Sequence, residues 1–476
     1  MKVSYASLAL LMLLPGCAAL ERTRGDSAEE APAAADSLTF HIPQEWQASA
    51  VASDGAIAGG WANSFGPDVE ALIAEALANN LDLRASTESV AQAEALLAQS
   101  RSALFPFITA GVSASEAEPL EEASTPGGFN FANPGAIDSY NASLSLSWEA
   151  DLRGVNRAGV RASEARLQSS QAILEASRQN IAAVTAVSYF DLVAARRQLG
   201  LAQRTEEANA ESTRLVERLF EAGAVSRRDQ ALSRADLSSA REAVVTAENS
   251  VRQAQRALEV LLGRYPEAEI DSADALPDAP GLLAPGTPLE LLRRRPDVVA
   301  AEFNLISGQA GADQARARLW PQLTFSSSLS SGATDIGDVF DPASAAVSVG
   351  LQLAQTLFDG GLRGAQIDAA DASVREALAQ YGAAVLAAYA DVENTSDLLA
   401  NLQEREVFLE AALADSIEAL ELTELRYRAG DTDLLDVLSL RQRRFGAERV
   451  LIANQAAQLQ TQARLYQALG GPITAN

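Results

Sequence analysis

The chain of 476 residues has one cysteine and one histidine, and aromatic residues make up only 5% of it. A lone cysteine excludes an internal disulfide, and the chain has no His/Cys cluster of the kind that binds zinc. It also has no nucleophile elbow and no phosphate-binding glycine loop, so we predict neither an enzyme nor a cofactor. No apolar run reaches the roughly 20 residues of a membrane-spanning helix. Any membrane crossing must therefore use β-strands.

The charge balance is strongly acidic, with a net charge of −26. Nucleic acids are bound largely by Lys and Arg side chains that neutralise phosphates, so this balance excludes a nucleic-acid partner. The only histidine, His41, precedes Pro43 in an extended stretch, and we interpret it as structural or incidental.

The first residues predict export. Lys2 and the apolar run from Leu8 to Leu14 give residues 1–16 the features of a secretory signal peptide. The run Leu14-Pro15-Gly16-Cys17 is similar to the bacterial lipobox, in which the cysteine becomes the acylated first residue. Residues 17–60 would then be a lipidated tether and an extended segment. The alternative is a buried free cysteine near an ordinary cleavage site. Alanine rather than aspartate follows Cys17, so the lipobox resemblance implies the outer membrane.

Four stretches alternate between apolar and polar residues, which is the pattern of β-strands. In Ser139–Glu149 the apolar face has aromatic residues at both ends, as in a transmembrane barrel, although a soluble sandwich fits this stretch alone equally well. We place two strand pairs at 107–149 and 322–355. Their apolar faces contain Ile108, Ala110, Val112 and Ala114; Tyr140, Ala142, Leu144, Leu146 and Trp148; Leu323, Phe325 and Leu329; and Val347, Val349, Leu351 and Leu353.

Four strands cannot close a membrane barrel, because the smallest known barrels need about eight. An open sheet edge cannot face lipid, so several chains must share one barrel. The strands alone allow a dimer, a trimer or a tetramer.

The remainder of the chain predicts long helices in two repeats. No proline occurs between Pro134 and Pro266 or between Pro342 and Pro472, and these stretches are rich in helix-forming residues. A helix from Val155 to Leu219 would be roughly 100 Å long, which suggests a coiled-coil-like column. The predicted organisation is a first repeat at 61–265, a proline-rich linker at 266–288, a second repeat at 289–471 and a tail at 472–476.

Strand pair, column helix, Ala-Gly turn and return helix, duplicated behind a lipobox, resemble the outer-membrane factor family. These proteins are TolC-like exit ducts, here in the lipoprotein form of multidrug efflux. The resemblance covers nearly all of the mature chain. It implies a mainly α-helical tunnel and four strands per chain in a shared, trimeric, 12-stranded barrel. The motifs that carry it are Asn80-Leu81-Asp82-Leu83-Arg84, Ser100-Arg101-Ser102-Ala103-Leu104-Phe105-Pro106, Leu357-Phe358-Asp359-Gly360-Gly361 and Ala429-Gly430-Asp431-Thr432-Asp433-Leu434-Leu435-Asp436-Val437-Leu438.

The resemblance implies a passive duct in the bacterial outer membrane that extends into the periplasm. It would receive drugs and toxic compounds from a periplasmic adaptor and a proton-driven inner-membrane pump. The alternatives are a duct for type I protein secretion and a structural coiled-coil protein. The lipobox favours drug efflux over protein secretion, and a structural protein would not need four amphipathic strands.

The two Ala-Gly turns predict the tips of the helical hairpins, where the resemblance implies that the adaptor binds. Glycine also suits a helix end, so capping alone could explain both glycines. Three aspartates follow the second turn, but they lack the glycine and distal glutamate of a calcium loop, and we predict no metal site. The predicted adaptor contacts are Gly223, Val225, Ser226, Gly430, Thr432 and Leu434.

Opposite charges on the two tips predict an electrostatic gate between neighbouring chains. Ser439 and Gln442 stand where many members of the resembled family have Asp and Arg, so the gate is placed on other residues. The predicted gate consists of Arg227, Arg228, Asp433, Leu435 and Asp436.

Overall fold

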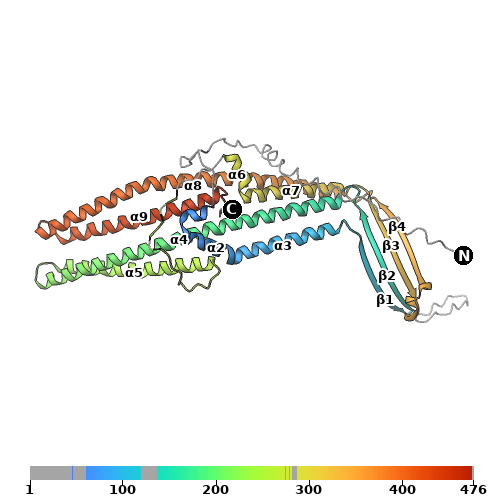
Figure 1. Ribbon diagram of the computed structural model, residues 1–476, viewed down its shortest axis with the longest axis horizontal. Coiled ribbons are helices and arrows are strands. Elements are labelled where there is room, and N and C mark those ends of the chain that lie inside the picture. The colour runs from blue at the N-terminus through green and yellow to red at the C-terminus, as the bar shows by residue number, and fades with distance from the viewer. Residues whose placement is uncertain are drawn as a thin grey trace.

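The computed structural model describes residues 46, 60–118, 137–273, 275–277, 279–280 and 287–473. The predicted signal peptide, Cys17 and His41 lie outside the described residues. The described chain is elongated, with helices along most of its length and the strands at one end (Figure 1).

The four predicted strands are confirmed, and they form one antiparallel sheet in the order β1-β2-β3-β4. The register keeps the two faces separate: Leu144 pairs with Ala110 on one side and with Leu329 on the other. The apolar face is exposed, and Val112 and Val347 are 79% and 72% accessible. The strands are β1 (Phe107–Ala117), β2 (Ile137–Ala150), β3 (Gln322–Ala333) and β4 (Ala345–Ala354).

The helices follow the predicted two-repeat plan. Two very long helices, of 67 and 68 residues, each run about 100 Å at 1.5 Å per residue. None of the described helices has an apolar stretch that could span a membrane. The helices are α2 (Pro67–Asn79), α3 (Leu81–Ser102), α4 (Val155–Glu221), α5 (Arg227–Leu261), α6 (Pro288–Arg294), α7 (Pro296–Ala317), α8 (Leu362–Ala429) and α9 (Leu434–Ala468); the 3-10 helices are η1 (Trp61–Phe65), η2 (Ile336–Phe340) and η3 (Pro342–Ser344).

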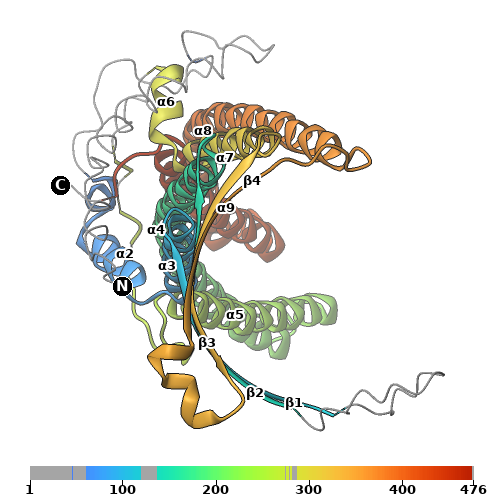
Figure 2. The ribbon, with the colours of Figure 1, turned by 90° about the vertical axis from the view of Figure 1, so that its right-hand side faces the viewer.

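The helices pack differently in the two halves of the column. Near the sheet, α3, α4, α7 and α8 lie side by side, whereas towards the far end α4 pairs with α5 and α8 pairs with α9. Leu402 and Leu420 on α8 are each 4% exposed, as expected for members of one apolar helical face. Viewed from the sheet end, sheet and helices form an arc that is open on one side (Figure 2).

The largest side chains are buried near the middle of the column, where η1 packs on α4 and α9. The ring of Phe65 lies 5.2 Å from that of Phe190 and 5.6 Å from that of Tyr466, measured between centroids. Trp61 is 1% exposed, and its backbone N–H donates to the carbonyl of Pro472 at 3.1 Å. Because this cluster joins the start of the first repeat to the end of the second, it holds both repeats in one folded unit.

Candidate functional site

The first hairpin tip joins α4 to α5 at the end of the column farthest from the sheet (Figure 1). Gly223 has a φ of 72°, which a residue with a side chain rarely adopts. Ser226 and Asp229 form a capping box: the Ser226 hydroxyl accepts from the Asp229 N–H at 3.2 Å, and the Asp229 carboxylate accepts from the Ser226 N–H at 3.1 Å. Hydrogen bonds from Ser226 lower the pKa of Asp229. The carboxylate therefore stays ionised and keeps the start of α5 in place.

The second tip, between α8 and α9, repeats this design. Gly430 has a φ of 82°, and Asp433 caps α9 by accepting from the Asp436 N–H at 3.1 Å. The hydroxyl of Thr432 donates to the Asp436 carboxylate. Asp433 and Asp436, which the sequence places in the gate, thus also have a local role in starting α9.

The predicted gate residues are not joined within one chain. Arg227 and Arg228 are exposed in the first turn of α5, and Arg228 lies 3.7 Å from Asp229 of its own tip. Within the described residues, no ion pair links either arginine to Asp433 or Asp436. A contact between the arginines and these aspartates would therefore have to form between neighbouring chains.

Sequence reasoning missed the side chains that hold the two hairpins together. Arg441 on α9 donates to the hydroxyl of Ser212 on α4 at 2.8 Å and to the carboxylate of Glu424 on α8 at 2.9 Å. Farther along the column, Arg204 on α4 donates to Glu448 on α9. These bonds join α4 to α9, so α5 and α8 are the outer flanks of the paired hairpins. The position of Arg441 in the sequence does not predict that it joins the hairpins, because its partners lie on two other helices.

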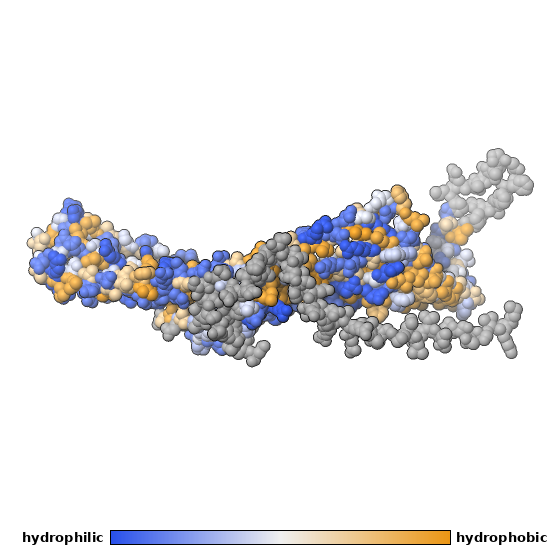
Figure 3. Space-filling model, turned by 90° about the horizontal axis from the view of Figure 1, so that it is seen from above, coloured by the Kyte–Doolittle hydropathy of each residue, from blue (hydrophilic) through white to orange (hydrophobic). Residues whose placement is uncertain are grey.

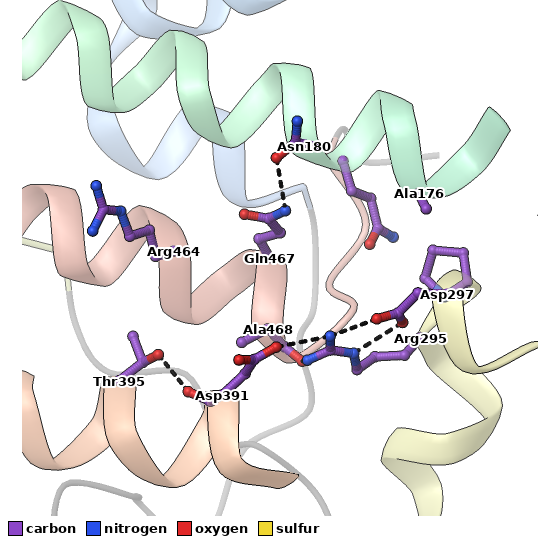
Figure 4. A pocket seen from close by; sticks show the side chains of 11 residues that line it. Ala176, Asn180, Arg295, Asp297, Asp391, Thr395, Arg464, Gln467 and Ala468 are labelled. Carbon is purple, nitrogen blue, oxygen red and sulfur yellow. Dashed lines mark hydrogen bonds and ion pairs between the residues drawn. The ribbon is translucent and has the colours of Figure 1, made fainter. Parts of the chain in front are cut away.

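A second polar cluster surrounds Arg295, where α7 begins (Figure 4). Arg295 is only 8% exposed, and its guanidinium donates to the carboxylates of Asp297 at 2.6 Å and Asp391 at 3.0 Å. Burial alone would raise the pKa of Asp297, but hydrogen bonding and the charge of Arg295 outweigh this effect and lower it. The cluster lines a pocket of about 410 Å³, and Asn180, Arg464 and Gln467 also face it.

The Arg295 cluster is structural, because the first repeat has an equivalent contact. Arg295 also donates to the carbonyl of Ala468 at 3.3 Å, near the end of α9. At the corresponding place in the first repeat, Asn80 donates to the carbonyl of Leu261, at the end of α5, at 2.9 Å. Each repeat thus uses the residue before a 22-residue helix, α3 or α7, to fix the end of its return helix.

The described residues contain no group of three or more His, Cys, Asp or Glu side chains placed to bind a metal ion. The structural features that remain are an exposed apolar sheet and a helical column of about 100 Å with capped tips. Hydrophobic side chains appear on the surface at the end of the molecule that carries the strands (Figure 3). Together these features define a subunit of a membrane channel that extends far beyond the bilayer.

Comparison with known proteins identifies the channel type. The family model for outer membrane efflux proteins matches residues 72–264 and 287–471, so the chain belongs to this family. Its similarity to the pyoverdine export outer membrane protein OpmQ of Pseudomonas aeruginosa is 31% identity, covering 90% of this chain and 91% of OpmQ. The probable outer membrane lipoprotein SilC of Salmonella typhimurium is 26% identical, with 99% of both chains covered.

The solved structures agree with this assignment. The MtrE outer membrane channel of Neisseria gonorrhoeae, solved in its open state, superposes with a TM-score of 0.79 at 27% identity, covering 92% of this chain and 98% of MtrE. The protein is therefore an outer-membrane channel of an efflux system, which confirms the predicted family, fold class and exit-duct function. Relatives whose names state export of pyoverdine or efflux of cations favour efflux over the type I secretion alternative.

Proposed function

We propose that three copies of this chain assemble into one lipid-anchored exit duct for small molecules. The observation that carries the proposal is the four-stranded sheet whose outer strands, β1 and β4, each have one unpaired edge in the described chain. Lipid tolerates no such edge, so neighbouring chains must cover both. Three chains give twelve strands, an allowed barrel size. We expect a trimer by native mass spectrometry in detergent, and a stable monomer with full β content would refute this assembly.

The lipid anchor is proposed at Cys17, supported by the lipobox-like motif before it and by the lipoprotein named among the relatives. Mass spectrometry of the mature N-terminus should find a diacylglyceryl group on this cysteine. A Cys17→Ser variant should still assemble, because the barrel itself anchors the duct. An unmodified N-terminus at another residue would contradict the proposal.

The hairpin tips are proposed as the docking site of a periplasmic adaptor, through Gly223, Val225, Ser226, Gly430, Thr432 and Leu434. Both tips lie at the end of the column farthest from the sheet, where an adaptor could reach them. A photo-crosslinker at position 432 should capture the adaptor in cells. The same crosslinker at the exposed position 410, along α8, is the control, and equal capture at both positions would reject the tip as the docking site.

A latch between neighbouring tips is proposed to close the duct, with Arg227 and Arg228 facing Asp433 and Asp436, and with Leu435 narrowing the opening. The α4–α9 bonds support this arrangement, because they leave α5 and α8 as the flanks nearest to other chains. A surface ion pair contributes about 0–1 kcal/mol, so three pairs at roughly 1 kcal/mol would bias closure by about 3 kcal/mol. The double variant Arg227→Glu and Arg228→Glu should raise single-channel conductance. Normal assembly with unchanged conductance at low salt would refute the latch.

The duct is proposed to transport drugs and other toxic small molecules, without a cofactor or catalytic activity of its own, when coupled to a proton-driven inner-membrane pump. The efflux functions named for the relatives support small solutes over proteins. Deletion of the gene should sensitise cells to such compounds, and a protonophore should sensitise the wild type to the same degree. Unchanged sensitivity, or a defect confined to a secreted protein, would contradict the proposal.

A further inference from the structure

The polar face of the sheet is almost free of charge. Strand pairing places its residues in continuous rows, for example Ser145 between Thr109 and Ser328. Most of the side chains are short, and Ser328 and Ser348 share a hydrogen bond of 2.8 Å. Across the four strands, Glu149 is the one ionisable side chain on this face. The other polar residues on it are Thr109, Ser113, Ser115, Ser139, Asn141, Ser143, Ser145, Ser147, Gln322, Thr324, Ser326, Ser328, Ser330, Ser348 and Gln352.

Glu149 lies at the end of β2 that leads into α4. It pairs with Thr324 on β3, which in turn pairs with Gln352 on β4, so the three residues form one row across the sheet. The carboxylate has no hydrogen bond or ion pair within the described residues.

The two nearest arginines along the chain are engaged with other groups. Arg157 lies 3.3 Å from the carboxylate of Asp151, and the guanidinium of Arg153 lies 3.9 Å from the centre of the Trp320 ring. Neither arginine forms an ion pair with Glu149 in the described part of the chain.

We propose that Glu149 sets the charge preference of the duct, favouring cationic over anionic solutes. This inference rests on the proposed trimer, in which the apolar face meets lipid and the polar face lines the lumen. Threefold symmetry then turns one carboxylate into a ring of three at the junction of barrel and helical tunnel. Every transported solute passes this ring, and the remainder of the polar face of the four described strands offers only neutral groups.

The size of the effect follows from the barrel geometry. Twelve strands about 4.8 Å apart, tilted by about 40°, have a radius of roughly 12 Å, which places the carboxylates about 10 Å from the axis. Coulomb's law with water's dielectric constant and a Debye length of about 10 Å gives about a twofold enrichment of monovalent cations on the axis at 0.1 M salt. At 0.01 M the Debye length is about 30 Å and the enrichment rises to about fourfold.

The test is the reversal potential of single channels in planar bilayers under a KCl gradient. We expect Glu149→Gln to lower the K⁺/Cl⁻ permeability ratio by at least about twofold at 0.1 M, and by a larger factor at 0.01 M. Glu116→Gln removes the same charge from the opposite, apolar face of β1 and should leave the ratio unchanged. The double variant Glu149→Gln with Gln352→Glu moves the carboxylate along its row and should restore the ratio.

The outcomes distinguish failure of the proposed trimer from failure of the proposed role of Glu149. If the wild-type protein forms no trimer, the proposed assembly is wrong. If it conducts but Glu149→Gln leaves the ratio unchanged, or lowers it no more than Glu116→Gln does, the role of Glu149 is wrong. The role of Glu149 would also be wrong if the double variant assembles and conducts but has the same low K⁺/Cl⁻ permeability ratio as Glu149→Gln. A carboxylate at another position of the row would then not replace that of Glu149, so its charge would not be what sets the ratio.

Discussion

Glu259, near the end of α5, anchors the start of the linker between the two repeats. The residue is 3% exposed, and its two carboxylate oxygens accept from the N–H groups of Ala268, Glu269 and Ile270 at 2.8, 2.7 and 3.0 Å. Ala268 has a φ of 64°, in the left-handed region that disfavours a side chain. The carboxylate thus holds three consecutive amides and a strained residue in place.

Glu259→Gln tests this anchor with almost no change in shape. The amide of glutamine has one oxygen, so at least one of these part-buried or buried N–H groups faces a donor and loses its partner, while the remaining bonds lose their charge assistance. An unsatisfied buried N–H costs about 1–3 kcal/mol, and with the weaker remaining bonds we expect about 2–3 kcal/mol in total.

Hydrogen exchange measures this loss locally in the assembled channel. Because 1.4 kcal/mol corresponds to a factor of ten, we expect exchange of the 268–270 amides to accelerate by about 30- to 140-fold. The control is Glu267→Gln, which changes an exposed glutamate of the same segment. If the two variants accelerate exchange equally, the anchoring role of Glu259 is refuted.

The remaining predictions concern pH and the contacts that the two repeats share. Burial raises the pKa of Glu259, but the three backbone hydrogen bonds outweigh it and lower the pKa below its ordinary 4.5. The anchor therefore contributes fully above pH 4.5 and is lost as pH falls through the lowered value. Measured against the intrinsic exchange rate at each pH, the protection of these amides should fall in acid for the wild type but not for Glu259→Gln. Gly263→Ala and Gly470→Ala should each cost about 2–4 kcal/mol, because both glycines have positive φ and an added Cβ would lie 2.7 and 2.9 Å from a backbone carbonyl oxygen. Gly200→Ala, in mid-helix with nothing within 4 Å, should not destabilise the protein, and thermal unfolding that ranks all three alike would contradict this. Arg295→Met should lower the free energy of unfolding by about 2–4 kcal/mol, because two carboxylates and two carbonyls lose their partner. An unchanged melting temperature would show that the Arg295 cluster is not needed for stability.

Local patterns in the sequence determined the kind and order of the elements. Alternation over Ser139–Glu149 predicted a strand, and the proline-free stretch after it predicted a column helix, because each pattern reflects the two faces of a single element. The turns at Gly223 and Gly430 were equally predictable, since a helix that reverses needs a left-handed residue. The repeat followed from the same order of strand pair, long helix, Ala-Gly turn and return helix occurring twice, and together with the resemblance it was enough to predict the family.

Only the tertiary structure decided which distant residues meet. Glu259 and Arg441 give no signal in the sequence, because their partners are backbone groups or side chains brought near by packing between separate elements. The isolation of Glu149 likewise required the register of β2 with β3, two strands from different repeats whose pairing no local periodicity specifies. Spacing along the chain determines which side of its own element a residue occupies. What lies opposite that side depends on contacts between elements that only the folded chain brings together.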